Sequence, residues 1–87
     1  MKKIYVVVED YAYNGDEEIR PLRAFTTEEK AIAFLEDEWE LFKNTNEWIF
    51  PKCDEIEEYD TMKMAWRDGY YLDCHQEYFI KSVVLED

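Results

Sequence analysis

Residues 26–43 read TTEEKAIAFLEDEWELFK, and this stretch decides the fold because it is a strongly periodic amphipathic helix. At 100° per residue its apolar side chains fill an arc of about 180°. The arc contains Ala31, Ile32, Phe34, Leu35, Trp39, Leu41 and Phe42. Thr26 and Glu29 have the spacing of a capping box, so we expect the helix to begin at Thr26 and to end near Lys43.

Two strands are predicted before this helix. Residues 3–9, KIYVVVE, are rich in β-branched side chains and apolar on both faces, which is typical of a central strand. Asn14-Gly15 favours a two-residue hairpin turn, so we expect the return strand over residues 18–25. Pro21 has no amide hydrogen and therefore indicates an edge strand or a bulge.

The chain after the helix is less regular. Residues 44–60 are interpreted as a long connection, and apolar and polar side chains alternate from residue 61. Asp68-Gly69 predicts a second hairpin turn returning through residues 70–72, and residues 76–85 predict a closing strand. The order of elements predicts an α+β fold, a small antiparallel or mixed β-sheet with one main amphipathic helix packed on one face. The expected core packs Ile32, Leu35, Trp39 and Phe42 on Ile4, Val6, Val8 and the closing strand.

The chain carries IYVV at residues 4–7, FTTEEKA at residues 25–31 and YFIKSVVLED at residues 78–87. In these segments it resembles a loose group of small, uncharacterised bacterial and phage proteins. Those proteins open with a strand, carry a threonine- or serine-capped TEEKA helix and end in an acidic strand. The resemblance covers about half of the chain and implies no activity.

Length and composition indicate a single domain spanning residues 1–87, because 87 residues build one hydrophobic core. The 47% hydrophobic content argues against a disordered chain. The amino-terminal apolar run is shorter than the roughly 7–15 residues of a secretory signal, which predicts a cytoplasmic protein. In that reducing compartment Cys53 and Cys74 are expected to remain thiols.

Few residues in the sequence point to metal or catalytic chemistry. Cys53, Cys74 and His75 lack the paired spacing of a structural zinc site. Residues 54–60 lack the central glycine of an EF-hand and are interpreted as a solvated acidic loop, with a weak surface Ca²⁺ or Mg²⁺ site as the alternative. Cys74 and His75 are strand neighbours that point to opposite faces, which argues against a nucleophile–base pair. We therefore predict no bound metal, no cofactor and no enzymatic activity.

Glu38 is the one carboxylate inside the apolar arc of the helix. A buried carboxylate must be paired or protonated, or must reach the rim of the core. Arg20, Arg23 and Arg67 are the candidate partners, and we interpret Glu38 as structural rather than functional.

Charge is the feature that points to function. The chain has 22 acidic and 10 basic residues, a formal net charge of −12, and the acids are not confined to a tail. Such a chain repels phosphate backbones and anionic membranes, and its complementary partner is a basic protein surface. Trp39, Trp48 and Trp66 are candidate aromatic anchors for such an interface.

We therefore predict a small acidic protein-binding module that inhibits a basic, nucleic-acid-binding partner such as a nuclease. Immunity-type inhibitors and phage anti-defence proteins, anti-CRISPR proteins among them, are of this class. Nucleic-acid mimicry is one form of such inhibition, because Glu29 and Glu36 lie about 10.5 Å apart along a helix, close to three nucleotide rises of about 3.4 Å. The alternative is a non-catalytic accessory or structural domain that forms a homodimer through an open sheet edge. The predicted partner-binding surface consists of Glu29, Glu36, Asp37, Glu40, Asp54, Glu55, Glu57, Glu58 and Asp60.

Overall fold

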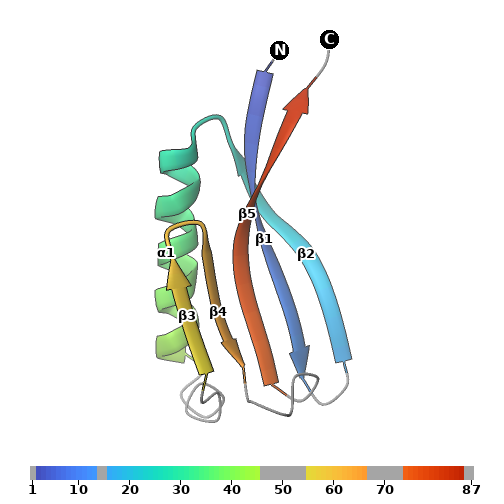
Figure 1. Ribbon diagram of the computed structural model, residues 1–87, viewed down its shortest axis with the longest axis vertical. Coiled ribbons are helices and arrows are strands. Elements are labelled where there is room, and N and C mark those ends of the chain that lie inside the picture. Colours follow the sequence, from blue (N-terminus) through green and yellow to red (C-terminus); the bar gives the residue numbers. More distant parts are fainter. Residues whose placement is uncertain (1, 14–15, 46–54, 67–73, 86–87) are drawn as a thin grey trace.

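A five-stranded antiparallel sheet carries an α-helix along one face (Figure 1). The computed structural model describes residues 2–13, 16–45, 55–66 and 74–85. In chain order the elements are β1 (Lys2–Tyr13), β2 (Asp16–Phe25), α1 (Glu28–Thr45), β3 (Glu55–Tyr59), β4 (Met62–Trp66) and β5 (Cys74–Leu85). The sheet order is β2-β1-β5-β4-β3, and each neighbouring pair is antiparallel. The predicted α+β fold is confirmed.

Strand β5 joins the two halves of the sheet. The β1–β2 hairpin lies on one side of it and the β3–β4 hairpin on the other. All twelve residues of β5 pair with β1, and residues 75–79 also pair with β4. The start of β1 and the end of β5 therefore lie together at one end of the sheet (Figure 1).

Strand β2 is an edge strand with an irregular register, as Pro21 predicts. The register with β1 shifts between Val7 and Val8, and Pro21 is the residue opposite Val8. Proline has no amide hydrogen to donate to a neighbouring strand. At a sheet edge or in a bulge no such donor is required. The predicted turn at Asn14-Gly15 lies outside the described residues, but the Tyr13↔Asp16 pair that brackets it confirms the hairpin.

The ends of α1 differ from the prediction by one or two residues. The Thr27 hydroxyl accepts a long hydrogen bond, 3.4 Å, from the backbone N–H of Lys30. Thr27 is therefore the N-cap, and the predicted Thr26–Glu29 capping box is wrong by one position. At the other end the Thr45 hydroxyl donates to the Leu41 carbonyl oxygen over 2.6 Å, and the helix ends at Thr45 rather than near Lys43.

The core lies between α1 and the sheet. It consists of Ala31, Leu35, Trp39 and Phe42 of the helix with Val7, Ala65 and Tyr78 of three strands. The Trp39 ring stacks on Phe42 at a centroid distance of 5.5 Å and meets Tyr78 edge-on at 6.2 Å. These aromatic contacts stabilise the second half of the helix against the central strand β5.

The strand face beneath the helix is the opposite of the predicted one. Val7 belongs to the buried cluster, whereas Ile4, Val6 and Val8 alternate onto the other face. We call the face with Val7 the helix face and the face with Val8 the outer face. Because β1 is apolar on both sides, its hydrophobic period does not identify the buried side. Ile32, predicted in the core, is half-buried and lies outside the buried cluster.

Part of the predicted acidic loop is a strand. Glu55–Tyr59 form β3, which pairs with β4 through a turn at Asp60 and Thr61. Acidic residues have low β-propensity, so the partner strand rather than the local sequence decides this structure. The predicted turn at Asp68-Gly69 and its return strand at residues 70–72 lie outside the described residues.

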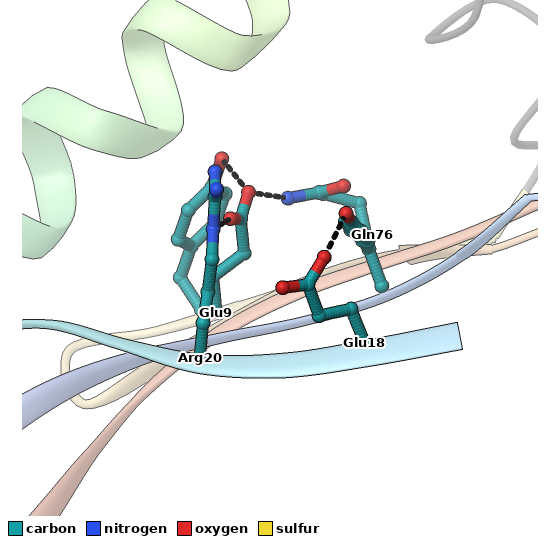
Figure 2. Close-up of polar contacts among 6 residues, drawn as sticks. Glu9, Glu18, Arg20 and Gln76 are labelled. Atoms are coloured by element: carbon teal, nitrogen blue, oxygen red, sulfur yellow. Dashed lines mark hydrogen bonds and ion pairs between the residues drawn. The ribbon is translucent and has the colours of Figure 1, made fainter. Parts of the chain in front are cut away.

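A buried carboxylate, that of Glu9, links three strands on the helix face (Figure 2). Its Oε1 accepts a hydrogen bond from Arg20 Nε of β2 at 2.6 Å. Its Oε2 accepts from Gln76 Nε2 at 2.5 Å and from the Tyr78 hydroxyl at 3.1 Å, both on β5. Burial, and then the charge of Glu9, raise the pKa of Tyr78, which keeps its phenol protonated as a donor.

Arg20 therefore pairs with Glu9 and not with Glu38, for which it was a candidate partner. Glu38 is half-buried, and the ion pairs among the described residues do not include it. The side chain of Glu9 is 10% exposed, so the buried carboxylate that requires a partner belongs to the first strand rather than to the helix.

Two leucines of α1 test the orientation of the helix. Leu35→Ala is expected to lower the free energy of unfolding by about 2–5 kcal/mol, because it leaves a cavity in the buried cluster. Leu41 is 56% exposed, and Leu41→Ala is the matched control with an expected change of about 0.5 kcal/mol or less. Urea denaturation followed by tryptophan fluorescence measures both. Equal effects of the two substitutions would contradict the helix orientation.

Glu9 is expected to contribute to stability more than an exposed carboxylate does. Glu9→Ala removes the acceptor of two buried donors, at about 1–3 kcal/mol for each. Glu18, which accepts a hydrogen bond from the Tyr11 hydroxyl at an exposed position, provides the control. Glu18→Ala should change stability by about 1 kcal/mol or less. Thermal unfolding at pH 7 compares the two variants, and equal losses would show that the Glu9 cluster is not buried.

Candidate functional site

An acidic groove lies between the second half of α1 and the β3–β4 hairpin, which run alongside each other in Figure 1. We call it the α1–β3 groove. Its lining consists of Glu36, Asp37, Trp39, Glu40, Lys43, Glu58 and Lys63. Four carboxylates against two ammonium groups make it negative. Its volume of about 320 Å³ is at the low end of the range for ligand pockets.

A fixed tryptophan and a shared carboxylate organise the groove. The Trp39 indole N–H donates to Glu58 Oε1 at 2.6 Å, which ties the helix to β3. Lys43 Nζ lies 3.0 Å from Glu40 Oε1 and 3.4 Å from Glu58 Oε1. The same ammonium group is 5.9 Å from the centroid of the Trp39 ring, within cation–π range.

These contacts favour the charged forms of Glu58 and Lys43. The hydrogen bond from Trp39 lowers the pKa of Glu58, opposed by partial burial and assisted by attraction to Lys43. The hydrogen bond to Glu40 is the main cause that raises the pKa of Lys43. Both shifts favour the ion pair between Glu58 and Lys43.

The structure brings together four residues of the predicted acidic surface. Glu36, Asp37 and Glu40 share one side of α1, as the helical period predicts, and Glu58 faces them from β3. The sequence marked Trp39 both as core and as a candidate aromatic anchor, and the structure places it in the buried cluster and in the lining of the groove. Lys43 and Lys63 were missed, and their approach to Glu58 is decided by the packing of α1 on the hairpin.

The other predicted surface residues lie elsewhere. Glu29 is in the first turn of α1, away from the groove lining. Glu55 is exposed at the start of β3, and Asp60 is exposed in the turn after it. Glu57 pairs with Met64 and so faces the outer side of the sheet. Asp54 lies outside the described residues.

A second polar cluster lies on the outer face. Asp10, His75 and Glu77 each bring one possible ligand atom to within 4.8 Å of the others. Asp10 and Glu77 are register partners on β1 and β5, and His75 precedes Glu77 by two residues. His75 is 1% exposed, and its Nε2 lies 3.5 Å from Glu77 Oε1.

Burial controls the protonation of this second cluster. It lowers the pKa of His75 against the attraction of Asp10, so the imidazole is neutral at pH 7. Burial and the charge of Asp10 both raise the pKa of Glu77. The sequence missed this grouping because 65 positions separate Asp10 from His75 and no local spacing joins them.

A family model, DUF7336, a domain of unknown function, matches residues 2–70. The chain belongs to the DUF7336 family. The match includes β1 to β4 and the whole α1–β3 groove, and it ends before β5, which carries His75 and Glu77. No curated protein and no solved structure matches the chain. Among the described residues, α1 is too polar to serve as a membrane-crossing helix.

The lowered pKa of Glu58 predicts a pH dependence that Glu58→Gln removes. A lowered folded-state pKa stabilises the fold above the unfolded value of about 4.5, and this stabilisation disappears as the pH falls through the folded value. Glu58→Gln should therefore be less stable than the wild type at pH 7, by about 1 kcal/mol or less since this side chain is 46% exposed. The difference should shrink below pH 4.5. Urea denaturation at pH 7 and pH 3 tests this, with the exposed Glu55→Gln on the same strand as control.

Proposed function

We propose that this protein is an acidic protein-binding module that inhibits a basic, nucleic-acid-binding partner, and that the α1–β3 groove is its contact site. The observation that supports the proposal is the convergence of Glu36, Asp37, Glu40 and Glu58 around Trp39. Carboxylates from two elements surround a buried aromatic side chain there, an arrangement suited to one or two basic side chains of a partner. The role is binding rather than catalysis.

The four carboxylates of the groove are of two kinds, two that pair with a lysine of this protein and two that are exposed to solvent. Glu40 and Glu58 already contact Lys43, which fixes their positions. Glu36 and Asp37 are exposed, and the ion pairs among the described residues include neither. They are the groups that a partner arginine would meet, because a guanidinium fork binds carboxylates in a bidentate way.

Inhibition follows from charge complementarity. A protein that binds nucleic acid presents a basic surface, and an acidic domain that covers this surface excludes the phosphate backbone. The net charge of −12 also raises the rate of encounter with such a surface and disfavours binding to nucleic acid itself. Phage anti-defence proteins, including anti-CRISPR proteins, and immunity proteins of nucleases are inhibitors of nucleic-acid-binding proteins. We place this protein among them, and in the cytoplasm.

A second candidate role, a homodimer through a sheet edge, has a specific observation in its favour. Strand β2 is an edge strand whose residues 16–21 are all exposed, and Ile19 is 67% exposed. An open edge with an apolar side chain pairs readily with another strand. Light scattering across protein concentration measures the oligomeric state, and a stable dimer that survives Ile19→Lys would exclude this edge.

The groove is tested by two charge-reversal variants with equal net charge. One carries Glu36→Lys and Asp37→Lys in the groove, and the control carries Asp16→Lys and Glu17→Lys on the exposed start of β2. A pull-down from the native host at low salt identifies the partner, and titration with the purified partner gives affinities. The groove variant should bind about tenfold more weakly or worse, and the control within about threefold.

Salt and competition give the second readout. Binding should weaken as the ionic strength rises and the Debye length falls below about 8 Å, and nucleic acid should compete with this protein for the partner. The inhibitor proposal would be contradicted if the affinity of the partner changed neither with salt nor with the groove substitutions. It would also be contradicted if the partner bound this protein and nucleic acid at the same time. Equal losses in both variants would show that only net charge matters and that the groove is not the contact.

A further inference from the structure

The cluster on the outer face has the donor atoms of a metal site. Two carboxylates and one imidazole come from adjacent strands, with His75 and Glu77 two positions apart and Asp10 directly across from Glu77. Side chains two apart on a strand share a face, so all three converge without help from a loop. The position is independent of the α1–β3 groove, which lies on the helix side of the sheet.

The carboxylates of Asp10 and Glu77 lie directly opposite each other on β1 and β5, and no Lys or Arg is next to them among the described residues of the outer face. Carboxylates directly opposite on neighbouring strands destabilise a sheet. Among the described residues, the neighbours of this pair along and across the outer face are apolar apart from His75. These neighbours are Val8, Ala12, Ile19, Met64 and Phe79. The repulsion between Asp10 and Glu77 is thus concentrated in a half-buried place where a divalent cation would relieve it.

The donor set selects the kind of cation. An imidazole nitrogen with two carboxylates suits Zn²⁺ and similar transition-metal ions, whereas Ca²⁺ and Mg²⁺ prefer oxygen ligands alone. Zinc bonds of about 2.0–2.2 Å in a tetrahedron hold ligand atoms about 3.4 Å apart. The 3.5 Å between His75 Nε2 and Glu77 Oε1 is already this separation. One carboxylate oxygen of Asp10 lies within 4.8 Å of the ligand atoms of both His75 and Glu77.

We propose that Asp10, His75 and Glu77 form a binding site for a divalent transition-metal ion, with Zn²⁺ as the best-fitting metal. The His75 imidazole supplies a nitrogen donor, and the two carboxylates balance the charge of the ion. Three protein ligands leave the fourth tetrahedral position to water or to a ligand of a partner. The prediction of no bound metal rested on the spacing of the cysteines and His75 and on the missing glycine of residues 54–60, and it did not bring Asp10 and Glu77 together with His75.

The test uses the metal-free full-length protein and Zn²⁺ as the probe, with calorimetric titration and thermal unfolding as readouts. We expect one Zn²⁺ per chain and a higher melting temperature when it is bound. Asp10→Asn and Glu77→Gln keep the side-chain shape and should each weaken zinc binding about tenfold or more. Both should raise the melting temperature of the metal-free protein, because they remove the carboxylate repulsion. Circular dichroism confirms that each variant is folded.

Glu57→Gln is the matched control, because Glu57 also faces the outer side of the sheet but lies on β3, three strands away from the strand of Asp10. Its zinc affinity should stay within about twofold of the wild type. An absence of zinc binding, or equal losses in Glu57→Gln and Glu77→Gln, would overturn the proposal. The same holds if Ca²⁺ or Mg²⁺ binds as tightly as Zn²⁺. A thiolate charge-transfer band with Co²⁺ would assign the metal to the cysteines and also overturn it.

Discussion

The buried carboxylate of Glu9 is the constraint on which the rest of the structure depends. A carboxylate taken out of water must receive hydrogen bonds, and Glu9 receives them from Arg20, Gln76 and Tyr78 on the two neighbouring strands. Strand β1 is apolar on both sides, so hydrophobic packing alone would tolerate either face beneath the helix. A slip of one residue would turn Glu9 away from its donors. The carboxylate thus selects one register for β2, β1 and β5.

The two polar sites follow from this register. With Glu9, Gln76 and Tyr78 on the helix face, alternation places Asp10, His75 and Glu77 together on the outer face. The hydrogen-bonded cluster and the proposed metal site are therefore opposite sides of the same two strands. A substitution that disturbs the Glu9 cluster would also shift the outer cluster, because both use the same strand pairing.

Strand β5 makes contacts between parts of the chain that are far apart in sequence. It lies between two local hairpins, and its pairing with β1 joins the two ends of the chain. Contacts so distant in sequence form late and slowly, because a long loop must close before they are made. The α1–β3 groove also depends on β5, since β5 holds β4, and with it β3, in the same sheet as the strands beneath the helix. The family match stops before this strand, although both proposed sites depend on it.

Local chemistry in the sequence by itself determined the amphipathic helix, the first hairpin and the edge position of β2. A 3.6-residue period identified Leu35, Trp39 and Phe42 as core, and the same period placed Glu36, Asp37 and Glu40 on the side of the helix opposite the apolar arc. The missing amide hydrogen of Pro21 predicted an edge strand or a bulge, and the structure has both. These features depend on residues close together in the chain, which is why pattern and propensity sufficed.

Only the tertiary structure decided which face of β1 lies beneath the helix, because both faces are apolar and the choice depends on donors from distant strands. It also turned the acidic residues 55–59 into a strand, since pairing with β4 outweighed their low propensity. That pairing made Glu58 the acceptor of the Trp39 indole. The grouping of Asp10 with His75 and Glu77 was likewise beyond the sequence, because it exists only through the pairing of the first strand with the last.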